Sequence, residues 1–112
     1  MNRRAFAALL MIGLATALFP RAAWAEDHLA EAISHTKEAI DHGKQGHPNV
    51  LAKHAEAALT HADAAENEKD NPHTKEGITH LNAVIDHGKQ RHADVATGHA
   101  EEALTHLQAA TK

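Results

Sequence analysis

The chain contains no cysteine and no tyrosine, and only one tryptophan and two phenylalanines occur among its 112 residues. Without cysteine it can form no disulfide, no thiolate metal site and no covalently attached c-type haem. Acidic residues outnumber basic ones, 15 to 11, which argues against a nucleic-acid partner because such a partner needs a basic face. Histidine, in contrast, occurs 12 times. Imidazole is therefore the abundant group through which this chain could bind a ligand.

The first 25 residues have the pattern of an export signal. Two arginines at 3 and 4 precede an apolar run (5–19) that is short for a membrane span, and AWA at 23–25 is a small-x-small cleavage motif. We expect cleavage after Ala25, by the general secretory or the twin-arginine route, and a single periplasmic domain of 87 residues, 26–112. An uncleaved membrane anchor is the alternative. With 8 basic and 15 acidic residues, the mature chain would have a net charge of −7.

The mature chain is an internal repeat. EAISHTKEAIDHGKQGHPNVLAKHAEAALTHADAA (31–65) aligns with EGITHLNAVIDHGKQRHADVATGHAEEALTHLQAA (76–110) at an offset of 45. Apolar residues recur at helical spacing, glycines at 43 and 88 are expected helix stops, and prolines at 48 and 72 suit helix starts. We predict an all-α, antiparallel up-down-up-down four-helix bundle made of two repeated helical hairpins, 28–66 and 73–111.

Few large residues are available for the core of this bundle, and alanine must fill the rest. A core this lean is marginal for the size of the chain, so a stabilising ligand is plausible. The expected larger core residues are Leu29, Ile33, Ile40, Val50, Leu51, Leu59, Ile78, Leu81, Val84, Ile85, Val95, Leu104 and Leu107.

Histidines are seven residues apart within each predicted helix, and the gap across each predicted turn is five. The positions of partners across a turn therefore sum to 89 in the first repeat and to 179 in the second. This register predicts three histidine pairs in each hairpin. The predicted pairs are His28 with His61, His35 with His54, His42 with His47, His73 with His106, His80 with His99, and His87 with His92. Alternatively, the histidines of the first and fourth helices, and of the second and third, could face each other.

Paired imidazoles with neighbouring carboxylates predict metal sites. Histidines seven apart in one helix are separated by about 10 Å, so a shared ion needs one histidine from each helix, with a glutamate or water completing its shell. Nitrogen and oxygen donors suit Cu(II), Ni(II) or Zn(II), with Cu(II) expected to bind most tightly. The glutamates could instead form only ion pairs on the helix surface. The predicted metal ligands are His28, His35, His42, His47, His54, His61, His73, His80, His87, His92, His99, His106, Glu31, Glu38, Glu76 and Glu102.

Several motifs resemble the small metal-binding protein family of bacterial periplasms. They are HGKQGH (42–47), LTHA (59–62), HLNA (80–83), VAT (95–97) and HA (99–100). The resemblance covers nearly the whole mature chain and implies a histidine-rich four-helix bundle with cytochrome b562-like topology. It also implies binding of several divalent ions, copper prominently, for metal tolerance or sequestration, and it extends that role to all twelve histidines.

Two other classes of function are compatible with a histidine-rich bundle. A haem bundle for electron transfer is disfavoured, because the mature chain has no methionine ligand and no tryptophan, tyrosine or phenylalanine to line a haem pocket. A pH-responsive periplasmic stress protein is the main alternative, because histidine side chains commonly titrate near pH 6.5. No nucleophile or oxyanion device is evident, so we expect no enzyme. We expect a monomer whose partners are divalent metal ions, with no membrane partner after cleavage.

Overall fold

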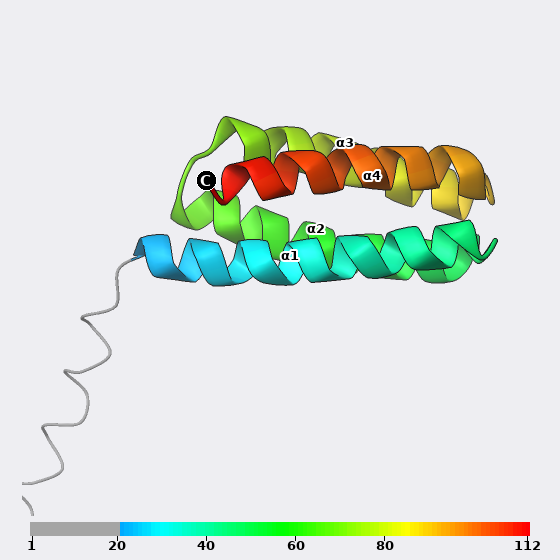
Figure 1. The fold of residues 1–112 in the computed structure, drawn as a ribbon, viewed down its shortest axis with the longest axis horizontal. Helices are drawn as coiled ribbons and strands as arrows, with labels where there is room; N and C mark the ends of the chain where they lie inside the picture. Colours follow the sequence, from blue (N-terminus) through cyan, green and yellow to red (C-terminus); the bar gives the residue numbers. More distant parts are fainter. Residues whose placement is uncertain (1–20) are drawn as a thin grey trace, which may run out of the picture.

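The computed structural model describes residues 21–112, which form four α-helices packed side by side (Figure 1). They are α1 (Arg21–Lys44), α2 (Pro48–Glu68), α3 (Pro72–Lys89) and α4 (Ala93–Ala110). The chain reverses direction at each connection, and α1 and α3 each pack against both α2 and α4. The predicted all-α four-helix bundle is confirmed, and no strand occurs within residues 21–112.

Most of the expected export signal lies outside the described residues. α1 begins at Arg21, so the expected cleavage point after Ala25 falls within the first two turns of this helix. Ala25 is buried, whereas Trp24 is exposed. Cleavage at this point remains a prediction, and it would retain every histidine and most of α1.

Local sequence signals set the helix starts. Pro48 is the first residue of α2, and the side-chain oxygen of Asn71 caps α3 by accepting a hydrogen bond from the backbone N–H two residues on, at 2.8 Å. At the link between the hairpins, the Lys75 ammonium contacts the carboxylates of both Asp70 and Glu66. Its hydrogen bond lowers the pKa of Asp70, whereas burial raises the pKa of Glu66. These contacts help to hold the second hairpin on the first.

Alanine supplies much of the core between the four helices. Eleven buried alanines accompany only a few large buried side chains, and Leu51, Leu81, Val84 and Leu107 are the largest apolar ones that are fully enclosed. Small side chains let helix backbones approach closely, so the bundle buries its interior with few large residues. The hydroxyl of buried Thr36 donates a hydrogen bond within its own helix, to the carbonyl four residues earlier, at 2.7 Å.

The expected core is confirmed in part. The residues Ile33, Leu59, Ile78 and Leu104 pack against it while partly exposed. The prediction is wrong for Val50 and Val95, which are 37% and 49% exposed. Both valines lie in the first turn of a helix, whereas the residues that follow them, Leu51 and Ala96, are buried.

Glycine at the turns acts differently from the prediction. Gly43 and Gly88 lie inside their helices, which end at Lys44 and Lys89. The left-handed conformation occurs three residues later, at Gly46 (φ 75°) in the first turn and at Arg91 (φ 66°) in the second. The expected helix-stop role of Gly43 and Gly88 is therefore wrong.

Gly43 instead lets three helices approach one another. A Cβ atom at this position would stand 2.0 Å from Oγ1 of Thr97 in α4 and 2.6 Å from Cδ1 of Leu51 in α2. Real Cβ atoms do not come this close to other heavy atoms, so a side chain at position 43 requires the Thr97 and Leu51 side chains to shift within the packed core. Gly98, in contrast, lies on an exposed helix surface with no atom within 4 Å of such a Cβ.

Two glycine-to-alanine substitutions should therefore change stability in opposite directions. Gly43→Ala should lower the free energy of unfolding by roughly 1–3 kcal/mol, the usual cost of overpacking. Gly98→Ala should raise it by about 0.5–1 kcal/mol, because alanine is the better helix former. Urea unfolding followed by circular dichroism measures both values. Equal effects of the two substitutions would contradict the close helix packing at Gly43.

Candidate metal centre

The rings of all twelve histidines form two continuous chains of contacts, one on each hairpin. The first imidazole chain runs through His28, His61, His35, His54, His42 and His47, with consecutive ring centroids 5.3–5.9 Å apart. The second imidazole chain runs through His73, His106, His80, His99, His87 and His92, with spacings of 5.5–5.9 Å. All six predicted pairs are confirmed as ring contacts. Among the described residues, no ring contact joins the two chains.

Contacts beyond the predicted pairs arise from the direction in which helical side chains lean. Side chains lean toward the N-terminus of their own helix, so in two antiparallel helices the facing columns shift in opposite directions. This shift carries the His35 ring toward His61 and away from His47. His35 therefore contacts two histidines of α2, His54 at 5.9 Å and His61 at 5.8 Å. The three pairs of each hairpin merge into a single zigzag of six rings.

The nitrogen atoms of facing rings lie at separations that fit one metal ion. Nδ1 of His28 is 3.1 Å from Nδ1 of His61, and Nδ1 of His80 is 3.3 Å from Nδ1 of His99. Two nitrogens bound at about 2.0 Å to a single ion stand about 2.8–3.4 Å apart, for square-planar to tetrahedral angles. These two imidazole pairs therefore match the separation of two ligands on one ion.

Several imidazole nitrogens lack partners in the protein. Among residues 21–112, the buried Nδ1 atoms of His35, His42 and His87 make no hydrogen bond. A buried polar atom without a partner costs free energy, about 1–3 kcal/mol, unless a ligand satisfies it. Nδ1 of His35 lies 3.5 Å from a carboxylate oxygen of Glu38, so it faces another potential metal ligand.

Four groups place a carboxylate together with two imidazoles from different helices. In each group the three ligand atoms lie within 4.8 Å of one another. The groups are Glu31–His35–His61 and His35–Glu38–His54 on the first hairpin, and Glu76–His80–His106 and His80–His99–Glu102 on the second. All four glutamates predicted from the sequence belong to these groups. Each follows or precedes a histidine by three or four positions, the spacing that places side chains on one helix face.

The two hairpins obtain one of their carboxylates from different helices. Glu38 comes from α1, and the equivalent position of the second repeat is Ala83. Glu102 comes from α4, and its equivalent in the first repeat is Ala57. Glu38 lies beside the pair His35–His54, and Glu102 lies beside the equivalent pair His80–His99, so both hairpins keep a carboxylate at this pair.

Six predicted histidine ligands lie outside these groups although their rings contact others. They are His28, His42, His47, His73, His87 and His92. The positions three residues after His42 and His87 are glutamines, and Glu38, four residues before His42, forms no such group with it. The metal role of these six histidines, like that of the other predicted ligands, remains a prediction.

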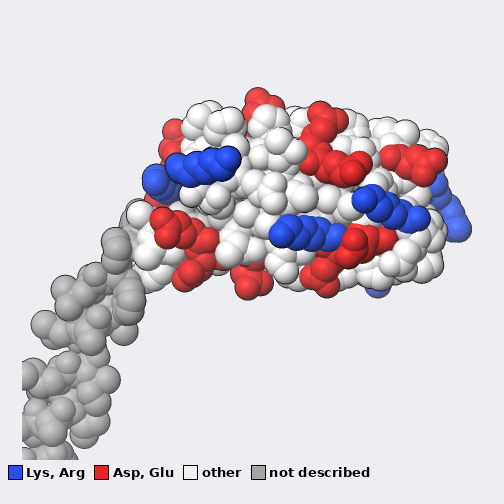
Figure 2. Space-filling view, viewed as in Figure 1, with Lys and Arg blue, Asp and Glu red and all other residues white. Residues whose placement is uncertain are grey.

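The groups are accessible to solvent from the sides of the bundle. The side chains of His35, His54 and His80 are 28%, 24% and 19% exposed, whereas Glu38 and Glu102 are at least half exposed. On the face seen in Figure 2, acidic and basic side chains alternate without a large patch of one sign. A cation can therefore reach the imidazoles through flexible carboxylates and without opening the core.

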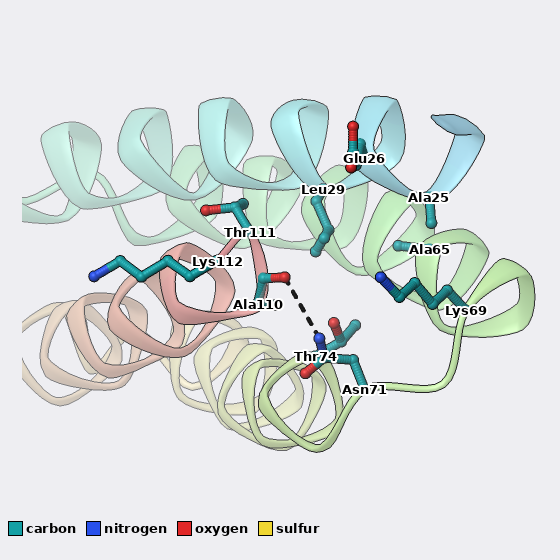
Figure 3. A pocket seen from close by; sticks show the side chains of 10 residues that line it. All are labelled: Ala25, Glu26, Leu29, Ala65, Lys69, Asn71, Thr74, Ala110, Thr111 and Lys112. Atoms are coloured by element: carbon teal, nitrogen blue, oxygen red, sulfur yellow. Dashed lines mark hydrogen bonds between the residues drawn. The ribbon is translucent and has the colours of Figure 1, made fainter. Parts of the chain in front are cut away.

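A separate cavity of about 180 Å³ lies at the end of the bundle away from the hairpin turns (Figure 3). Its lining includes Leu29, Lys69 and Lys112, and the Asn71 side-chain amide donates a hydrogen bond to the Ala110 carbonyl beside it, at 3.4 Å. It contains no histidine and is not part of the candidate centre. Within residues 21–112, none of the helices combines the length and apolar character required to cross a bilayer.

Comparison with known proteins agrees with this geometry. The model of one protein family, described as small metal-binding protein, matches residues 3–110. No curated protein sequence matches the chain. The family match covers both hairpins and therefore both imidazole chains.

Proposed function

We propose, from the premise that this chain belongs to the small metal-binding protein family, that it binds divalent transition-metal ions between the helices of each hairpin. The observation that carries this proposal is that His35 and His80 each form two groups, each with one further imidazole and one carboxylate, whose ligand atoms lie within 4.8 Å of one another. Imidazole and carboxylate donors together suit Cu(II), Ni(II) and Zn(II), and the absence of thiolates disfavours selective capture of Cu(I).

Copper(II) is the proposed preferred ion. The groups supply three protein ligands and are open to water, so they impose no closed tetrahedral cage that would favour Zn(II). In an open site of this kind, affinity follows the general order in which Cu(II) exceeds Ni(II) and Zn(II). The distance between facing Nδ1 atoms, 3.1–3.3 Å, fits two ligands of one ion and does not by itself distinguish Cu(II) from Zn(II).

The proposed biological role is sequestration or storage of these ions in the periplasm, as part of metal tolerance. Residues 1–25 have an export pattern, and an exported chain without cysteine keeps its metal ligands unchanged in an oxidising compartment. Binding rather than catalysis is proposed because the groups lie on the flanks of the bundle, apart from the cavity of Figure 3.

Calorimetric titration of the mature chain with Cu(II), Ni(II), Zn(II) and Fe(II) tests the proposed preference. We expect Cu(II) to bind at least about tenfold more tightly than Zn(II) at neutral pH, following the general affinity order. Native mass spectrometry of the same samples gives the number of ions per chain. Tighter binding of Zn(II) than of Cu(II) would contradict open sites of imidazole and carboxylate.

A further inference from the structure

His35 and His80 each belong to two of the four groups. His35 lies between His61 and Glu31 on one side and His54 and Glu38 on the other. His80 has the same central place on the second hairpin, between His106 with Glu76 and His99 with Glu102. The remaining members of the four groups each occur once. A count of four groups is therefore not a count of four independent sites.

A neutral imidazole has one nitrogen that carries a proton and one that can bind a metal ion. His35 can consequently serve only one of its two groups at a time, unless both of its nitrogens are deprotonated. Two divalent ions placed on either side of one ring would also repel each other strongly at such a short distance. Both effects oppose simultaneous occupation of the two groups on a hairpin.

We propose that each hairpin holds one tightly bound ion, shared between two alternative three-ligand positions that have His35, or His80, in common. This inference rests on the proposed function and specifies its stoichiometry, which is two tight ions per chain. His54 with Glu38 and His61 with Glu31 are interchangeable partners on the first hairpin.

The remaining ring contacts of the imidazole chains differ from these positions. His42 contacts both His47 and His54, but no carboxylate joins these rings in a group of three. His28 contacts His61, again without a carboxylate in such a group. Ions bound only at these ends of an imidazole chain have fewer protein ligands and should bind more weakly than the shared ion.

Sharing predicts an unusual response to substitution, which is simplest to measure on one hairpin at a time. In an His80→Ala background, which disables the second hairpin, native mass spectrometry with Cu(II) and a competing chelator should detect one tight ion. Adding His54→Ala or His61→Ala should leave that ion bound and lower the affinity for it only about twofold, because one of two equivalent positions remains. Adding both substitutions together, or His35→Ala alone, should abolish tight binding.

Thr60→Ala in the same background, at an exposed position outside both imidazole chains, serves as the control and should not remove the tight ion. Alanine is a good helix former, so each variant should remain helical, which circular dichroism verifies. Loss of the ion in His61→Ala alone would refute sharing and indicate a fixed site at His35 and His61. Two tight ions in the His80→Ala background would refute it as well. Failure of the unsubstituted chain to bind any ion would instead refute the proposed function.

Discussion

Copper(II) should raise the thermal unfolding midpoint of the mature chain by about 20 °C or more when free copper is 100-fold above the dissociation constant. A ligand that binds only the folded state at this concentration adds about 2.7 kcal/mol for each site, hence about 5 kcal/mol for two ions. For a domain of this size, each kcal/mol shifts the midpoint by about 4–8 °C. The effect should be large because the core is built mainly from alanine and leaves a modest intrinsic stability.

The double variant His35→Ala/His80→Ala should lose most of this stabilisation, because each of the four groups contains one of these two histidines. A matched variant, His47→Ala/His92→Ala, removes two exposed histidines that lie outside the groups and should retain it. Differential scanning calorimetry with and without Cu(II) measures both shifts. Equal stabilisation of the two double variants would show that copper binds elsewhere.

Removal of the four glutamates should lower copper affinity while leaving both imidazole chains intact. The variant carries Glu31→Gln, Glu38→Gln, Glu76→Gln and Glu102→Gln, which retain side-chain size and remove charge. We expect an affinity loss of at least about tenfold at each hairpin, since even outer partners of metal ligands contribute 10- to 100-fold. The result decides between metal ligation and simple ion pairing for these carboxylates, because ion pairs on a helix surface contribute only a few tenths of a kcal/mol.

A matched control separates ligation from the general attraction between an acidic protein and a cation. Glu26→Gln, Glu56→Gln, Asp63→Asn and Glu101→Gln also remove four negative charges, at exposed positions outside the groups. Calorimetric titration of both variants at 0.15 M salt, where distant charges are largely screened, gives the comparison. An equal loss in both variants would mean that the four glutamates act only through net charge.

The pairing of histidines could be predicted because it depends on the number of residues in the turn between two antiparallel helices. A turn of fixed length places positions with a constant sum at the same height on two antiparallel helices, whatever their detailed packing. In the first hairpin, His42 and His47 flank the turn, and the other two pairs follow from them at intervals of seven residues along each helix. The helix starts at Pro48 and Pro72 were predictable for a similar reason, since each signal acts within a few residues.

The zigzag of six rings required information that a helical wheel does not contain. A wheel gives the angle of each residue around the helix but omits the lean of its side chain along the axis, which brings His61 to His35. The tilt is a general property of helices, so the sequence did contain a signal for this contact. The role of Gly43 differs in kind, because its close neighbour Thr97 lies on a helix 54 positions away in the chain. No local sequence pattern predicts that contact.

Electron paramagnetic resonance of the copper-loaded chain, with ¹⁵N-labelled histidine, tests the central claim most directly. At one Cu(II) per hairpin, we expect two imidazole nitrogens and at least one oxygen on each ion. Because histidines within one helix are about 10 Å apart, two imidazoles on one ion must come from two helices. Coordination by a single imidazole, or by backbone amide nitrogens, would contradict a metal centre built between the helices of each hairpin.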